Sequence, residues 1–75
     1  MFKVIVQIDK ADHYLTTEGT FAPVADCHPS GDEIALHEAR EFATMEGAVA
    51  AYYATNTPHP GMVLNTLSRF KHVIA

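Results

Sequence analysis

The fold is organised around residues 39–56, which read AREFATMEGAVAAYYATN. This stretch predicts the end of a strand over 40–43, a hinge at Thr44 and a helix that ends at Asn56. Thr44 is a good N-cap, because its hydroxyl can accept a hydrogen bond from an unpaired amide of the first helical turn. At about 3.6 residues per turn, the larger apolar residues share one helix face: Met45, Val49, Tyr52 and Tyr53.

The opposite face of this helix carries small residues and almost no charge: Gly47, Ala50, Ala51 and Ala54. A surface helix normally presents charged residues there, so both faces of the helix are candidates for cover. Small residues let a helix lie close to a sheet or to a second helix. Alternatively, they form a flat docking patch for self-association or for another protein.

The first strand is predicted over residues 2–8, where apolar residues alternate with residues of the opposite face. Phe2, Val4, Val6 and Ile8 are expected to face the core, and Lys3, Ile5 and Gln7 to face outward. The polar run 9–12 is turn-like and ends this strand.

Two further strands follow, joined by a hairpin at Glu18 and Gly19, since glycine tolerates a positive φ. The second strand, over 13–18, is expected to place Leu15 toward the core. Pro23 cannot donate to a sheet ladder, so the third strand, over 20–27, is expected at an edge or a bulge. The outward residues of the second and third strands form a candidate partner-binding surface: Tyr14, Thr16, Glu18 and Asp26.

Residues 33–43 admit two interpretations. Ser30 and Glu33 have capping-box spacing, and the residues that follow favour helix. However, the segment follows a loop over 28–32 and can pair as a hairpin with the third strand. We favour a fourth strand and leave the helix as the alternative.

A second helix is predicted from Pro60, which suits a first helical turn, with apolar residues at helical spacing from Val63 to Ile74. The expected fold class is therefore α+β: a small antiparallel sheet of three or four strands followed by a two-helix hairpin packed on one face. The expected core joins the sheet to both helices: Phe42, Val49, Tyr52, Leu67 and Phe70.

Composition indicates one folded domain over residues 1–75, because 48% of the residues are hydrophobic and 19% are charged. No apolar run approaches the roughly 20 residues of a membrane span, and 2–8 is too short for a signal-peptide core. The net charge of −4 argues against direct nucleic-acid binding. A single cysteine, Cys27, excludes an intrachain disulfide framework and fits a reducing cytoplasm.

Histidine and cysteine side chains suggest a metal site in only one place, where Asp26, Cys27 and His28 could meet His37. Neither C-x-x-C nor H-x-x-x-H spacing occurs there, so we expect surface histidines, a buried thiol and no metal or other cofactor. A Cys-His nucleophile pair is conceivable. A chain this short leaves little room for a pocket and an oxyanion hole, so we do not expect an enzyme.

The order of hairpin strands, an A-R-E-F strand, a T-x-E helix start and a Pro/Gly loop resembles small phage-encoded anti-CRISPR proteins of the type I-F inhibitor kind. The matching residues are Ala39, Arg40, Glu41, Phe42, Thr44, Glu46, Tyr52, Tyr53, Pro60 and Gly61. The resemblance implies a four-stranded antiparallel sheet backed by two antiparallel helices. It also implies an inhibitor that docks, through tyrosines and acids of the open sheet face, on a crRNA-guided surveillance complex and obstructs binding of target DNA. The first strand departs from this pattern, with Ile5 and Gln7 where an aromatic residue would help.

We therefore expect a non-catalytic protein-interaction module, an inhibitor acting in the cytoplasm of a bacterial host cell. One alternative is a small homodimeric structural or regulatory protein that uses the small-residue helix face or an edge strand. Another is a metal-binding regulator that uses Cys27, His28 and His37.

Overall fold

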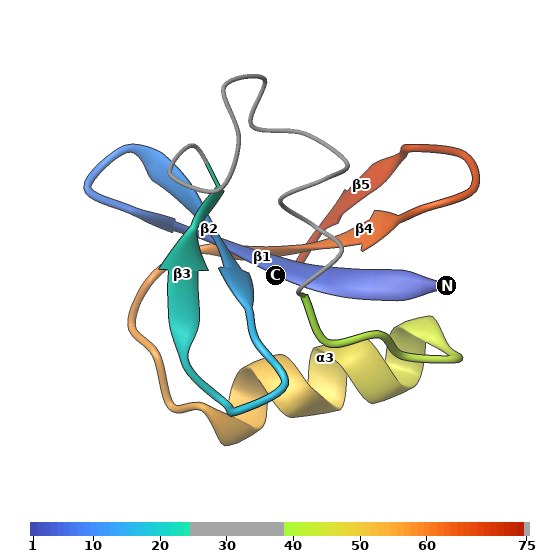
Figure 1. The fold of residues 1–75 in the computed structure, drawn as a ribbon, viewed down its shortest axis with the longest axis horizontal. Coiled ribbons are helices and arrows are strands. Elements are labelled where there is room, and N and C mark those ends of the chain that lie inside the picture. Colours follow the sequence, from blue (N-terminus) through green and yellow to red (C-terminus); the bar gives the residue numbers. More distant parts are fainter. Residues whose placement is uncertain (25–38, 75) are drawn as a thin grey trace.

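The strand nearest the N-terminus lies in the middle of the sheet in the computed structural model, which describes residues 1–24 and 39–74 (Figure 1). Neighbouring strands are antiparallel. Helix α3 (Met45–Ala54) covers one face of this sheet. From one edge to the other, the strands are β3 (Phe21–Pro23), β2 (Ala11–Leu15), β1 (Phe2–Ile8), β4 (Gly61–Asn65) and β5 (Lys71–Val73).

Tight turns set the register of the first three strands. Asp9 and Lys10 have φ of 52° and 68°, which makes a two-residue hairpin loop whose twist matches that of the paired strands. Between β2 and β3, Gly19 has φ of 84°, and the Thr16 N–H donates to the Thr20 carbonyl at 2.8 Å. Pro23 lies on an edge strand, as the sequence predicts.

The start of α3 is set by the expected residue, and its end lies two residues before the predicted Asn56. The Thr44 Oγ1 accepts a hydrogen bond from the Gly47 N–H at 3.0 Å, which confirms the predicted N-cap. The helix ends at Ala54, and Asn56 follows in the left-handed region with φ of 54°. Within the two described ranges, no helix has the length and apolar character that crossing a membrane requires.

The prediction of a second helix is wrong, because residues 60–74 form the β4–β5 hairpin. Within residues 1–24 and 39–74 the fold is a five-stranded antiparallel sheet with one short helix, not a sheet followed by a two-helix hairpin. Asn65 starts the turn: its Oδ1 accepts from the Leu67 N–H at 3.0 Å, and its carbonyl accepts from the Arg69 N–H at 2.7 Å. Arg69 then reverses the chain at a φ of 63°. These turn contacts outweigh the helical spacing of the apolar residues.

The ambiguous segment 33–43 is described only from Ala39 onward. Ala39 pairs with Thr16, and Phe42 pairs with Phe2, each as an isolated antiparallel bridge. The described end of the segment is therefore extended and sheet-paired, although it forms no strand of its own.

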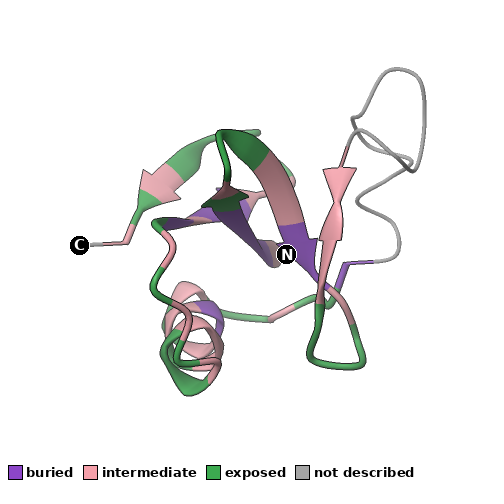
Figure 2. Ribbon diagram, turned by 90° about the vertical axis from the view of Figure 1, so that its left-hand side faces the viewer, coloured by how far each residue is buried: buried purple, intermediate pink, exposed green. Residues whose placement is uncertain are grey.

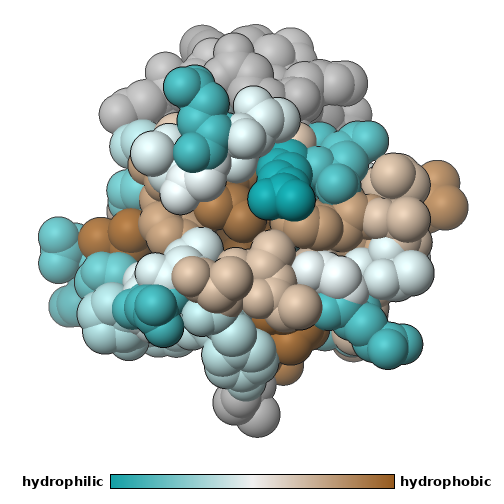
Figure 3. All heavy atoms as spheres, turned by 90° about the horizontal axis from the view of Figure 1, so that it is seen from below, coloured by the Kyte–Doolittle hydropathy of each residue, from teal (hydrophilic) through white to brown (hydrophobic). Residues whose placement is uncertain are grey.

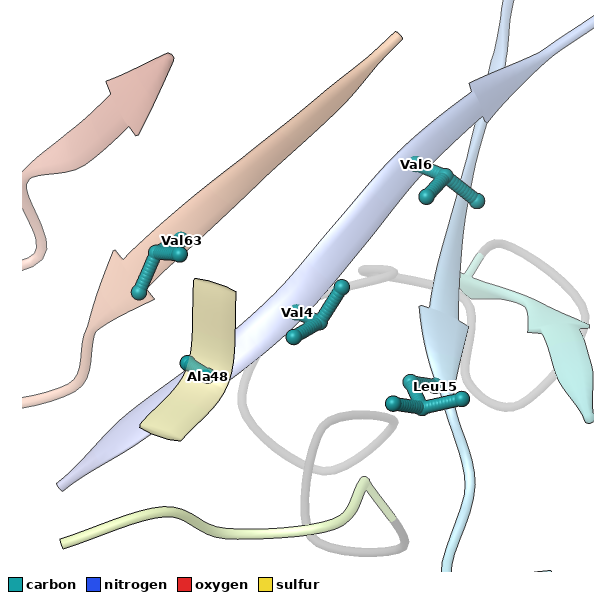
Figure 4. Close-up of a cluster of buried hydrophobic side chains, with 5 residues drawn as sticks. All are labelled: Val4, Val6, Leu15, Ala48 and Val63. Carbon is teal, nitrogen blue, oxygen red and sulfur yellow. The ribbon is translucent and has the colours of Figure 1, made fainter. Parts of the chain in front are cut away.

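The core between the sheet and α3 is built from small and branched side chains of β1, β2, β4 and α3, which Figure 4 shows as sticks. Phe42, Val49 and Tyr52 pack against this core, as predicted. Leu67 and Phe70 do not, because they are 88% and 59% exposed on the β4–β5 hairpin. The buried members are Val4, Val6, Leu15, Ala48 and Val63.

The other face of the sheet is also buried, which corrects the expectation that it is solvated. Its core is formed by Ile5, Tyr14, Ala39 and Leu64. Lys3 is only 4% exposed on this face and pairs with Glu41 at 3.6 Å. The consecutive apolar residues 4–6 explain the result, since a strand buried on both faces loses its alternation.

Candidate protein-binding surface

Tyr14 does not belong to an exposed docking surface. It is 1% exposed and packs with Ile5 and Leu64 in the second core. The prediction that it faces solvent is wrong because that face of the sheet is covered.

Thr16 and Glu18 of the predicted surface lie at the turn between β2 and β3. Thr16 closes the β2–β3 turn, where its Oγ1 lies 2.9 Å from the Thr20 Oγ1. Glu18 is exposed in the same turn. Asp26 lies outside the described residues.

The small-residue face of α3 divides into exposed and packed members. Ala50 and Ala54 are exposed, whereas Ala51 packs against the first core and Gly47 is half-buried. The helix face toward the core passes through Ala48, which is fully buried. Viewed from the side of α3, tan and brown atoms cross the middle of the molecule among teal groups (Figure 3).

The candidate metal ligands Cys27, His28 and His37 lie outside the described residues. Among residues 1–24 and 39–74, no group of three or more His, Cys, Asp or Glu side chains is placed to hold a metal ion.

Three of the five large apolar side chains that are exposed in the described part of the chain lie on the β4–β5 hairpin. Leu67, Phe70 and Val73 are 88%, 59% and 80% exposed. Figure 2 shows β5, next to the C-terminus, in green and pink at the margin of the sheet. We call these three residues, with Arg69 and Lys71 between them, the hairpin surface. Sequence reasoning missed it because helical spacing assigned Leu67 and Phe70 to the core.

The ring of Phe70 lies beside that of His72, with 4.6 Å between the ring centroids. Both residues therefore stand on the same side of the hairpin, as alternate residues of a strand do. Lys71 and Val73 point to the opposite side. The hairpin surface thus wraps both sides of the sheet margin.

Charge is divided unevenly along the chain. Residues 1–46 carry all nine Asp and Glu and three of the five Lys and Arg, a net charge of −6. Residues 47–75 carry Arg69 and Lys71 and no acid, a net charge of +2. The segment that holds the hairpin surface is therefore basic within an acidic chain.

Comparison with known proteins adds no relative to this description. No protein-family model matches the chain, and no curated protein or solved structure is significantly similar to it.

Proposed function

We propose that this protein acts by binding another protein through the hairpin surface. The proposal is carried by the exposure of Leu67, Phe70 and Val73 on one hairpin. Apolar side chains left exposed to water contribute little to folding, and exposed apolar surface is typical of interaction sites. Phenylalanine and arginine are also enriched in protein interfaces.

The test compares proteins captured from a bacterial lysate by the wild type and by a Leu67→Ser/Phe70→Ser variant. The matched control is Tyr53→Ser, which removes a side chain that is 55% exposed on α3. We expect at least one protein to be captured by the wild type and the control and lost by the hairpin variant. Equal capture by all three would contradict the proposal.

The finer prediction is that the partner is a subunit of a crRNA-guided surveillance complex. The two antiparallel helices that the resemblance implies are replaced here by α3 and the β4–β5 hairpin, so only the residue matches support this partner. The direct test measures target-DNA binding by a purified type I-F complex with and without the protein. Unchanged DNA binding at saturating protein would remove this partner and leave the hairpin surface as a site for another one.

A further inference from the structure

The outer edge of β5 exposes main-chain groups. The Ile74 N–H donates to the Gly61 carbonyl, and the Asn65 N–H donates to the Phe70 carbonyl, both at 2.9 Å. In an antiparallel ladder, alternate residues point their N–H and C=O groups to the same neighbour. The main-chain N–H and C=O groups of residues 72 and 74, and the C=O of Phe70, therefore point toward β4. Those of Lys71 and Val73 point away from the sheet.

The opposite edge of the sheet differs. The Thr16 N–H donates to the Thr20 carbonyl at 2.8 Å. By the same alternation, the main-chain groups of Phe21 and Pro23 in β3 point away from β2. Proline has no N–H, so the outer side of β3 lacks a donor at residue 23. Of the two edge strands that the structure describes, β3 has an outward N–H only at Phe21, whereas β5 has one at both of its outward residues, Lys71 and Val73.

The side chains around the β5 edge indicate what would bind there. Val73, 80% exposed, offers apolar contact on one side of the edge, and Phe70 offers it on the other. Lys71 contributes positive charge in a segment free of acids. Its contact with Asp12 spans 4.0 Å between half-exposed side chains, a pair that is weak and easily exchanged.

We infer that the β5 edge accepts an extended acidic segment of a partner protein as an additional strand of the sheet. The inference rests on the proposed function and specifies how the hairpin surface is used. Main-chain hydrogen bonds supply affinity in such strand addition, and alternate side chains supply specificity. The charge of the hairpin selects acidic over basic segments.

The experiment uses the full chain and a fluorescein-labelled peptide in which Glu and Val alternate over the length of an ordinary strand, with binding followed by anisotropy. A second peptide has the same sequence with N-methyl groups on alternate residues, and a third replaces Glu by Lys. We expect binding of the first peptide only, with affinity that falls as salt concentration rises.

Three variants test the residues. Val73→Pro removes an outward donor while leaving the bonds to β4, and we expect it to weaken binding by about tenfold or more. Lys71→Glu should also weaken binding of the Glu peptide. Lys10→Glu is the matched control, because it makes the same charge change in the exposed β1–β2 turn, and it should bind like the wild type.

Several outcomes overturn the inference. Equal binding of the N-methylated peptide would show that main-chain pairing is not used, and the hairpin surface would remain a docking site of another kind. If oligothymidylate displaced the labelled Glu peptide as well as unlabelled Glu peptide does, the hairpin would be attracting negative charge of any kind. A dimer in solution that Val73→Pro converts to a monomer would make a second copy the occupant. No binding of the Glu peptide by the wild type up to about 1 mM would also overturn it.

Discussion

Gly61 is where β4 passes under the ring of Tyr52. The Tyr52 hydroxyl donates to the His59 carbonyl at 2.6 Å, which holds the ring in place. A Cβ added at Gly61 would lie within 2.9 Å of three ring carbons. Contacts this close force the ring or the strand to move, so glycine is required by packing here rather than by backbone conformation.

Gly61→Ala should therefore lower the free energy of unfolding by about 1–3 kcal/mol, measured by urea denaturation. The same substitution in a Tyr52→Ala background should cost much less, because the clashing ring is gone. Equal costs in the two backgrounds would show that the ring is not the obstacle.

Loss of the N-cap of α3 should have a smaller effect on the free energy of unfolding. Thr44→Ala removes the acceptor for the Gly47 N–H and should cost about 1 kcal/mol. Thr44→Ser keeps a hydroxyl and should stay within a few tenths of the wild type. An alanine variant as stable as the serine variant would mean that the hydrogen bond contributes nothing.

At the scale of elements, sequence patterns located most strands and the helix start. Three features each favoured a single local structure: the alternation of 2–8 favoured a strand, Gly19 a turn and Thr44 the start of a helix. Residues 60–74 had two, since apolar positions from Val63 to Ile74 fit helical spacing as well as a hairpin. The side chains of Asn65 and Ser68 accept hydrogen bonds from nearby amides in the turn, but the sequence prediction gave more weight to the helical spacing.

The hairpin and a helix make opposite predictions for Leu67, and the buried Val63 is the reference. Leu67→Ala should change the free energy of unfolding by less than about 0.5 kcal/mol, because Leu67 is 88% exposed. Val63→Ala should cost about 2 kcal/mol, because Val63 is fully buried. Thermal and urea unfolding of both variants would check this, and a large loss for Leu67→Ala would restore the helical packing.

At the scale of the whole molecule, a sheet covered on both faces explains why Tyr14 is not on an exposed binding surface. Alternation in the sequence showed which residues face α3, but it did not show that Ile5 and Tyr14 would be buried as well. That burial depends on Ala39, far along the chain, returning to pack on the second face. The pairing of β1 with β4, which makes residues 61–65 a strand, is likewise a contact between residues far apart in the sequence, and the pattern did not predict it.

Burial of Tyr14 gives a prediction for the whole fold. Tyr14→Ala should cost about 3–5 kcal/mol, enough to unfold much of a domain this small. Tyr53→Ala should cost about 1 kcal/mol or less, because Tyr53 is 55% exposed and its ring makes an edge contact with Tyr52 rather than a core contact. Circular dichroism melts of the two variants provide the comparison, and similar melting temperatures would contradict the second core.

The central place of β1 has a consequence during synthesis. The ribosome delivers β1, β2 and β3 in succession, and they can pair through their short turns as they emerge. The other side of β1 pairs with residues 61–65, so it waits until most of the chain has been made. Through that interval a nascent chain exposes an unpaired, apolar strand edge, the kind of surface that chaperones bind and that aggregation uses.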